Sequence, residues 1–137
     1  MKILINRKPI LDFLSKEYNL KQNIFVIWES MVKLINDTYL HFNKNMSNDL
    51  NYRNFETIGC GTALITDYNH MYDELGFVDG KNVIFYDDMN SLREKLDYYL
   101  EEKEILSKIG ESGEILSKRH TYKKRIKDLI NELHEKV

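Results

Sequence analysis

The residues best suited to chemistry lie in the stretch 51–67, which contains Arg53 and Glu56 three positions apart. Residues at this spacing lie on the same side of a helix. A carboxylate there can accept hydrogen bonds from two ribose hydroxyls, and a nearby guanidinium can attract a diphosphate. The spacing alone also fits a surface ion pair, which contributes roughly a few tenths of a kcal/mol.

A glycine-rich turn and a strand follow this short helix. Backbone N–H groups near Gly61 and Thr62 could approach a phosphate, although a helix C-cap and turn explain the same glycines. The chain contains no GxGxxG or GxxxxGK[ST] motif that would support a nucleotide site independently. We predict that the helix starts at the carboxyl edge of a parallel sheet, where open α/β folds bind ligands.

The other polar residues give weaker signals. Cys60 has no histidine at a recognisable spacing, so we interpret it as a packed thiol. Asp88 is expected to cap the helix that follows it, with Asp87 beside it. The four histidines show no metal-ligand spacing, so we expect neither a metal site nor a cofactor.

Elements that could position Arg53 and Glu56 follow from the hydrophobic periodicity. Strands are expected at 3–5, 38–42, 62–66 and 83–85, while 24–27 fits a strand or the buried start of a helix. Helices are expected from Pro9, at 31–35, 53–59 and 69–75, and from Asp88 onward. The alternation predicts a Rossmann-like α/β fold, with a parallel sheet of about four or five strands flanked by helices.

The C-terminal segment is expected to be helical, and its apolar stripe is expected to lie in the core. The residues of this stripe are Tyr122, Ile126, Leu129, Ile130, Leu133 and Val137. The basic run 118–125 is compensated by later acids, so a solvated helix face is favoured over a nucleic-acid site.

Composition limits the function classes. With 137 residues and no linker, the chain is expected to form one domain over 1–137. A net charge of −2 argues against a nucleic-acid partner. Apolar runs are too short to span a bilayer, and the start lacks a signal-peptide pattern. The single cysteine fits a reducing environment, so we expect a cytoplasmic protein without disulfides.

The order of these motifs resembles a known family. RNFETIGCG followed by a buried strand, INDTYLHFNKN before it, and FYDDMNSLREKLDYYL and HTYKKR after it are similar to "glycosyl transferases group 1" domains. That group includes spore-maturation-like proteins. The resemblance covers most of the chain and implies the C-terminal, donor-binding domain of a GT-B glycosyltransferase. It also implies that the segment of His120 and Tyr122 packs against the domain, so both residues are expected to be structural.

The resemblance implies a nucleotide sugar as partner, of the UDP- or GDP-sugar type. It implies that Glu56 holds the donor ribose and that Arg53, with the backbone near Gly61 and Thr62, neutralises the diphosphate. The family's first acid falls on Asn48, which departs from the pattern. A catalytic base would come from an acceptor-binding domain, so the chain alone is expected to turn over little or nothing.

Two alternatives remain open. The first is a non-catalytic interaction module that keeps the fold and pairs with a partner subunit or with itself, which the asparagine at position 48 favours. The second is a nucleotide-binding or response-regulator-like domain, since a flavodoxin-like domain of this length would share the alternation of strand and helix. The second is disfavoured because Asn6 and Arg7 stand where acids after a first strand would be expected.

Overall fold

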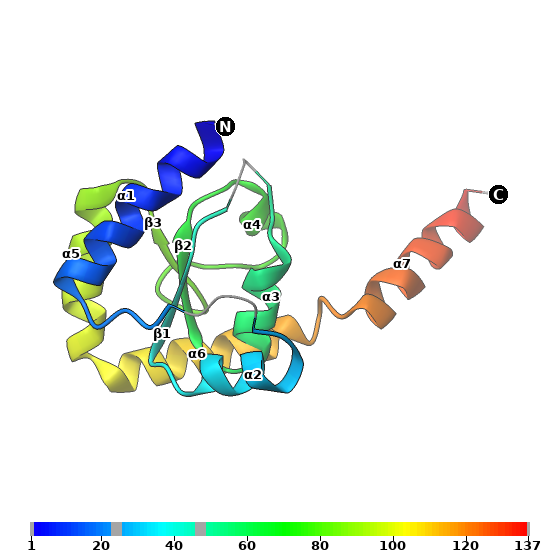
Figure 1. Ribbon diagram of the computed structural model, residues 1–137. Helices are drawn as coiled ribbons and strands as arrows, with labels where there is room; N and C mark the ends of the chain where they lie inside the picture. Colours follow the sequence, from blue (N-terminus) through cyan, green and yellow to red (C-terminus); the bar gives the residue numbers. More distant parts are fainter. Residues whose placement is uncertain (1, 23–25, 46–48, 137) are drawn as a thin grey trace.

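A computed structural model describes residues 2–22, 26–45 and 49–136, with side chains from Arg7 onward. The regular elements, labelled in Figure 1, follow in chain order. They are α1 (Lys2–Glu17), α2 (Trp28–Asn36), β1 (Leu40–Asn43), α3 (Tyr52–Gly59), β2 (Ala63–Asp67), α4 (Met71–Glu74), β3 (Ile84–Tyr86), α5 (Met89–Glu101), α6 (Lys103–Ser117) and α7 (Tyr122–Glu135).

The sheet is parallel throughout and has the order β1-β2-β3. Leu40 pairs with Ala63 and Ile65 pairs with Ile84. The parallel sheet flanked by helices confirms the α/β class. The described residues form three strands, however, and not the four or five expected. Of the expected segment 24–27, residues 23–25 lie outside the described residues, and Val26 and Ile27 are not in a strand.

The expected strand at 3–5 is wrong, because these residues belong to α1. An apolar run of three residues cannot distinguish strand from helix by periodicity. Pro9, expected in the first turn, lies inside α1. The helix continues past this proline and packs on the sheet through Ile10 and Leu14, which are buried.

Alternate residues of the strands supply two separate cores, one on each face of the sheet. Ala63 and Ile65 of β2 pack with α1, α5 and the first half of α6. Leu64, on the opposite face, packs with α3, α4 and the end of α6. Figure 1 shows α6 running along one end of the sheet, which lets a single helix contact both cores.

The turn between α3 and β2 requires glycine. Gly61 has a φ of 74°, a conformation that residues with a side chain rarely adopt. Its carbonyl group lies against Gly110 of α6, where an added Cβ would come within 2.1 Å of the Gly61 oxygen. The two glycines therefore allow α6 to touch the backbone that enters the central strand.

Two expectations for the C-terminal half have different outcomes. Asp88 caps α5 as expected, because its carboxylate accepts a hydrogen bond from the Ser91 N–H at 2.8 Å. The expected burial of the last helix is wrong, because α7 has no buried residue and extends away from the body in Figure 1. Val137, the last residue of the expected stripe, lies outside the described residues. Within the described ranges, no helix is long and apolar enough to cross a membrane.

Candidate functional site

Helix α3 carries Arg53 and Glu56 in its first two turns. The Asn51 side chain caps α3 by accepting a hydrogen bond from the Arg53 N–H at 2.9 Å. Arg53 Nε lies 3.5 Å from Glu56 Oε2, with about two-fifths of each side chain exposed. The pair is therefore formed and can still be reached by a ligand.

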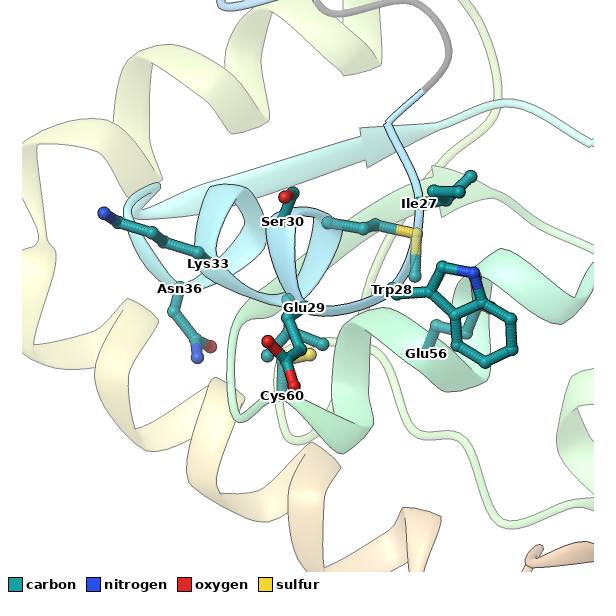
Figure 2. Close-up of a pocket in the computed structure, with 10 residues that line it drawn as sticks. Ile27, Trp28, Glu29, Ser30, Lys33, Asn36, Glu56 and Cys60 are labelled. Atoms are coloured by element: carbon teal, nitrogen blue, oxygen red, sulfur yellow. The ribbon is translucent and has the colours of Figure 1, made fainter.

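Two adjacent cavities meet at this ion pair. The larger, of about 1150 Å³, is lined by Ile27 and most residues of α2, together with Glu56 and Cys60 (Figure 2). The smaller, of about 370 Å³, is lined by Lys21 and Arg53 and by apolar residues of α2. Met31 lines both cavities and accepts a hydrogen bond from Arg53 Nη1 through its sulfur at 2.7 Å.

The charges of the two cavities differ. The larger contains the carboxylates of Glu29 and Glu56, with Lys33 on α2. The described residues that line the smaller cavity include the cations Lys21 and Arg53 and no carboxylate. A ligand that carries hydroxyl groups at one end and phosphate at the other matches this arrangement.

Gly61 and Thr62 lie at the amino end of β2, whereas α3 begins after the carboxyl end of β1. The Gly61 N–H donates to the Ile58 carbonyl at 3.0 Å. Thr62 is buried, and its hydroxyl donates to the Ile35 carbonyl at 3.1 Å. The structure thus brings Arg53 and Glu56 together, and it commits Gly61 and Thr62 to the packing of α2, α3 and β2.

The carboxyl end of β1 is occupied by a buried hydrogen-bond network, which we call the asparagine network: Asn43, Asn45, Asn54 and Tyr72. Asn43 Nδ2 donates to Asn54 Oδ1 at 2.6 Å, and Asn45 Nδ2 donates to Tyr72 Oη at 2.9 Å. Asn54 Nδ2 donates to Asn45 Oδ1 at 3.3 Å and to Tyr72 Oη. This network closes the sheet edge beside α3, so the open surface lies towards α2.

His41 of β1 packs against α3 and lines the smaller cavity. Its Nδ1–H donates to Thr57 Oγ1, whose own proton goes to the Arg53 carbonyl at 2.8 Å. Burial, and secondarily the charges of Arg53 and Arg7, lower the pKa of His41 from 6.5 to about 4. His41 is therefore neutral at pH 7, and the positive charge of this cavity comes from arginine and lysine.

The buried neutral histidine predicts a pH-dependent stability. The unfolded chain takes up a proton on His41 below pH 6.5, whereas the folded chain does so only near pH 4. Lowering the pH from 7 to 5 is thus expected to remove about 2 kcal/mol from the free energy of unfolding through this group. Urea denaturation at both pH values measures the loss, which His41→Gln should reduce and the exposed His134→Gln should not. An unchanged pH dependence in His41→Gln would contradict the assignment.

Two further expectations can be compared with the geometry. Burial, and then the charge of Glu56, raise the pKa of the Cys60 thiol, which disfavours the thiolate that nucleophilic catalysis needs. His120 Nε2 hydrogen-bonds the Leu75 carbonyl at 2.7 Å and its ring packs edge-on against Phe55, which confirms a structural role. Among the described residues, no three His, Cys, Asp or Glu side chains cluster to hold a metal ion.

Two features of this region leave no local pattern in the sequence. The asparagine network joins residues 43, 45, 54 and 72, which are distant in the chain and meet only in the fold. Trp28, which lines the larger cavity, directly follows the segment 24–27, for which the sequence predicts a strand or the buried start of a helix. An exposed tryptophan is unusual enough to be a signal, but its exposure is not visible in the sequence.

Comparison with known proteins identifies the class. The model of the family described as glycosyl transferase-like matches residues 8–131, and the chain belongs to this family. The match confirms the resemblance to glycosyltransferases and extends from α1 into α7. No curated protein and no solved structure matches the chain.

Proposed function

We propose that this domain binds the donor of a glycosyl transfer, a nucleoside diphosphate sugar, through Arg53 and Glu56. The observation that carries the proposal is the position of this ion pair at the junction of the two cavities. Family membership supports sugar transfer as the chemistry. Glu56 accepts hydrogen bonds from the ribose hydroxyls in the larger cavity, and Arg53 contacts the diphosphate in the smaller one.

The chemical role of the cations is electrostatic. Departure of a nucleoside diphosphate leaves negative charge on its phosphate oxygens, and a preorganised guanidinium stabilises that charge as it develops. Arg53 is held by Glu56 at 3.5 Å and by Met31, so its direction is set before the ligand arrives. Lys21 adds a second positive charge in the same cavity.

The proposal assigns only the donor half of the reaction. It includes a GT-B arrangement in which an acceptor-binding domain supplies the acceptor and any catalytic base. No residue described here is assigned as that base. In this proposal Gly61 and Thr62 do not contact the ligand. Their polar groups bond to the carbonyls of Ile58 in α3 and Ile35 in α2 and so hold these helices in place.

The test is isothermal titration calorimetry with UDP, GDP and their sugars. Glu56→Gln is expected to weaken binding by about 10–100-fold, because a charged acceptor of two hydroxyl hydrogen bonds is replaced by a neutral amide. Glu94→Gln, an exposed carboxylate on α5, is the matched control and should bind as the unchanged protein does. Glu56→Gln should fold, because the exposed ion pair with Arg53 contributes less than about 1 kcal/mol to stability.

Two results would contradict the proposal in different ways. Absence of binding by the unchanged protein at millimolar nucleotide would exclude the donor function. Equal binding by Glu56→Gln would leave a nucleotide function and remove this site from it.

A second candidate function is a non-catalytic interaction module. The observation that favours it is the exposed apolar stripe of α7, where Tyr122, Ile126 and Leu129 are each more than half exposed. Position 48, where the resemblance places the first acid, lies outside the described residues. Concentration-dependent association without nucleotide binding would support this candidate over the donor site.

A further inference from the structure

Trp28 is the only tryptophan of the chain, and it stands at the start of α2 with 80% of its surface exposed. Its φ of 53° is in the left-handed region, where a bulky side chain is strained. Strain of this kind is retained where the surrounding structure enforces it, and it is concentrated at ligand sites. The backbone thus holds a large flat ring out of the core at a conformational cost.

The ring belongs to the wall of the larger cavity. Figure 2 shows the Trp28 indole beside Glu56, on the side of α2 that faces α3. Ile27, next to it, is 66% exposed and lines the same cavity. The cavity therefore has an aromatic and aliphatic surface adjacent to a carboxylate.

The chemical groups follow one another in a fixed order. Trp28 and Glu56 share the larger cavity, Glu56 pairs with Arg53, and Arg53 shares the smaller cavity with Lys21. The order aromatic plane, carboxylate, cations corresponds to base, ribose and diphosphate in a nucleotide. Stacking on an aromatic ring suits any base, because every base has a π face.

We propose that Trp28 is the stacking platform for the base of the bound nucleotide, an inference that rests on the proposed function. The residue fixes where the base lies and tolerates purine and pyrimidine alike. Specificity between bases would then come from hydrogen bonds elsewhere and not from this ring.

The single tryptophan makes the contact directly measurable. Titration with UDP or GDP should change the Trp28 fluorescence with the affinity that calorimetry gives, because stacking places the base against the only indole. Inorganic diphosphate, which has no base, should leave the emission unchanged. Trp28→Ala should weaken nucleotide binding by about 10-fold or more, and Trp28→Phe by less, because phenylalanine keeps an aromatic face.

The control is Tyr98→Ala, which removes an exposed aromatic ring from α5. It should leave nucleotide affinity unchanged, and because Trp28 is itself exposed, neither alanine variant should unfold the domain. Circular dichroism of each variant checks this.

The outcomes separate this inference from the donor function. Calorimetric binding with unchanged emission, and with equal affinity in Trp28→Ala, would overturn the stacking role and leave the donor site standing. Lack of any nucleotide binding would overturn both. An emission that shifts with protein concentration in the absence of nucleotide would instead assign Trp28 to a contact between copies of the chain, and the inference would be wrong.

Discussion

Replacing Gly110 with alanine is expected to destabilise the domain by about 3 kcal/mol or more, at the upper end of the range for overpacked cores. The new Cβ would lie 2.1 Å from the Gly61 oxygen and 3.2 Å from the Ala63 nitrogen. Both are backbone atoms, which cannot rotate away as the end of a flexible side chain can. Helix α6 must therefore move, and it contacts both cores of the domain.

Two other glycines provide a graded control. At Gly113 a Cβ would lie 3.1 Å from Ile58 Cβ, so alanine there should cost less than at Gly110. At Gly59 the nearest atom would be Ser117 Oγ at 3.8 Å, an ordinary contact, and the change should stay within about 1 kcal/mol. Urea denaturation of the three variants measures this order. Equal stability of Gly110→Ala and Gly59→Ala would show that α6 does not approach the Gly61 turn as described.

The second large effect is expected for Asn54→Ala. Asn54 is fully buried and bonds to Asn43, Asn45 and Tyr72. Removing its amide leaves a buried amide donor on Asn43 and a buried acceptor on Asn45 without these partners. Each unsatisfied buried group costs about 1–3 kcal/mol, so the variant is expected to lose about 2–4 kcal/mol.

The measurement is urea denaturation, with Asn131→Ala on exposed α7 as the matched control. Tyr72→Phe should show a smaller loss, because it removes one hydroxyl and keeps the aromatic packing against Phe77. A loss in Asn54→Ala no larger than in Asn131→Ala would mean that the asparagine network adds nothing to stability. Because Asn54 and Arg53 are neighbours in α3, the destabilised variant should also bind nucleotide less well.

The sequence predicted best the parts of the fold that local signals define. The helix expected at 53–59 and the strand expected at 62–66 are present as Tyr52–Gly59 and Ala63–Asp67, because the glycine turn and the apolar run mark them locally. The cap at Asp88 belongs to the same class of short-range information. The strand expected at 38–42 is present as Leu40–Asn43.

Long-range contacts explain what the sequence did not predict. Residues 3–5 are apolar and β-prone, yet they continue a helix whose later turns pack on the sheet. The bonds from Asn45 to Tyr72 and from Thr62 to Ile35 join positions 27 residues apart. They decide which polar residues are open to a ligand. The Thr62 hydroxyl is used within the fold, whereas Arg53 and Glu56 line the cavities beside α2.

The exposed position of α7 has a consequence for how unfolding is observed. Its first turns contact the body, where Tyr122 stacks on Tyr52 and Arg125 lies over Phe55. A helix of this length without tertiary packing is marginal in water. The helical signal of α7 contributes to the far-ultraviolet circular dichroism. The near-ultraviolet signal of the buried Tyr72 and Tyr86 reports the packing of the α/β body instead. The two transitions should not coincide, and that difference would reflect independent melting of α7 rather than an intermediate of the α/β body.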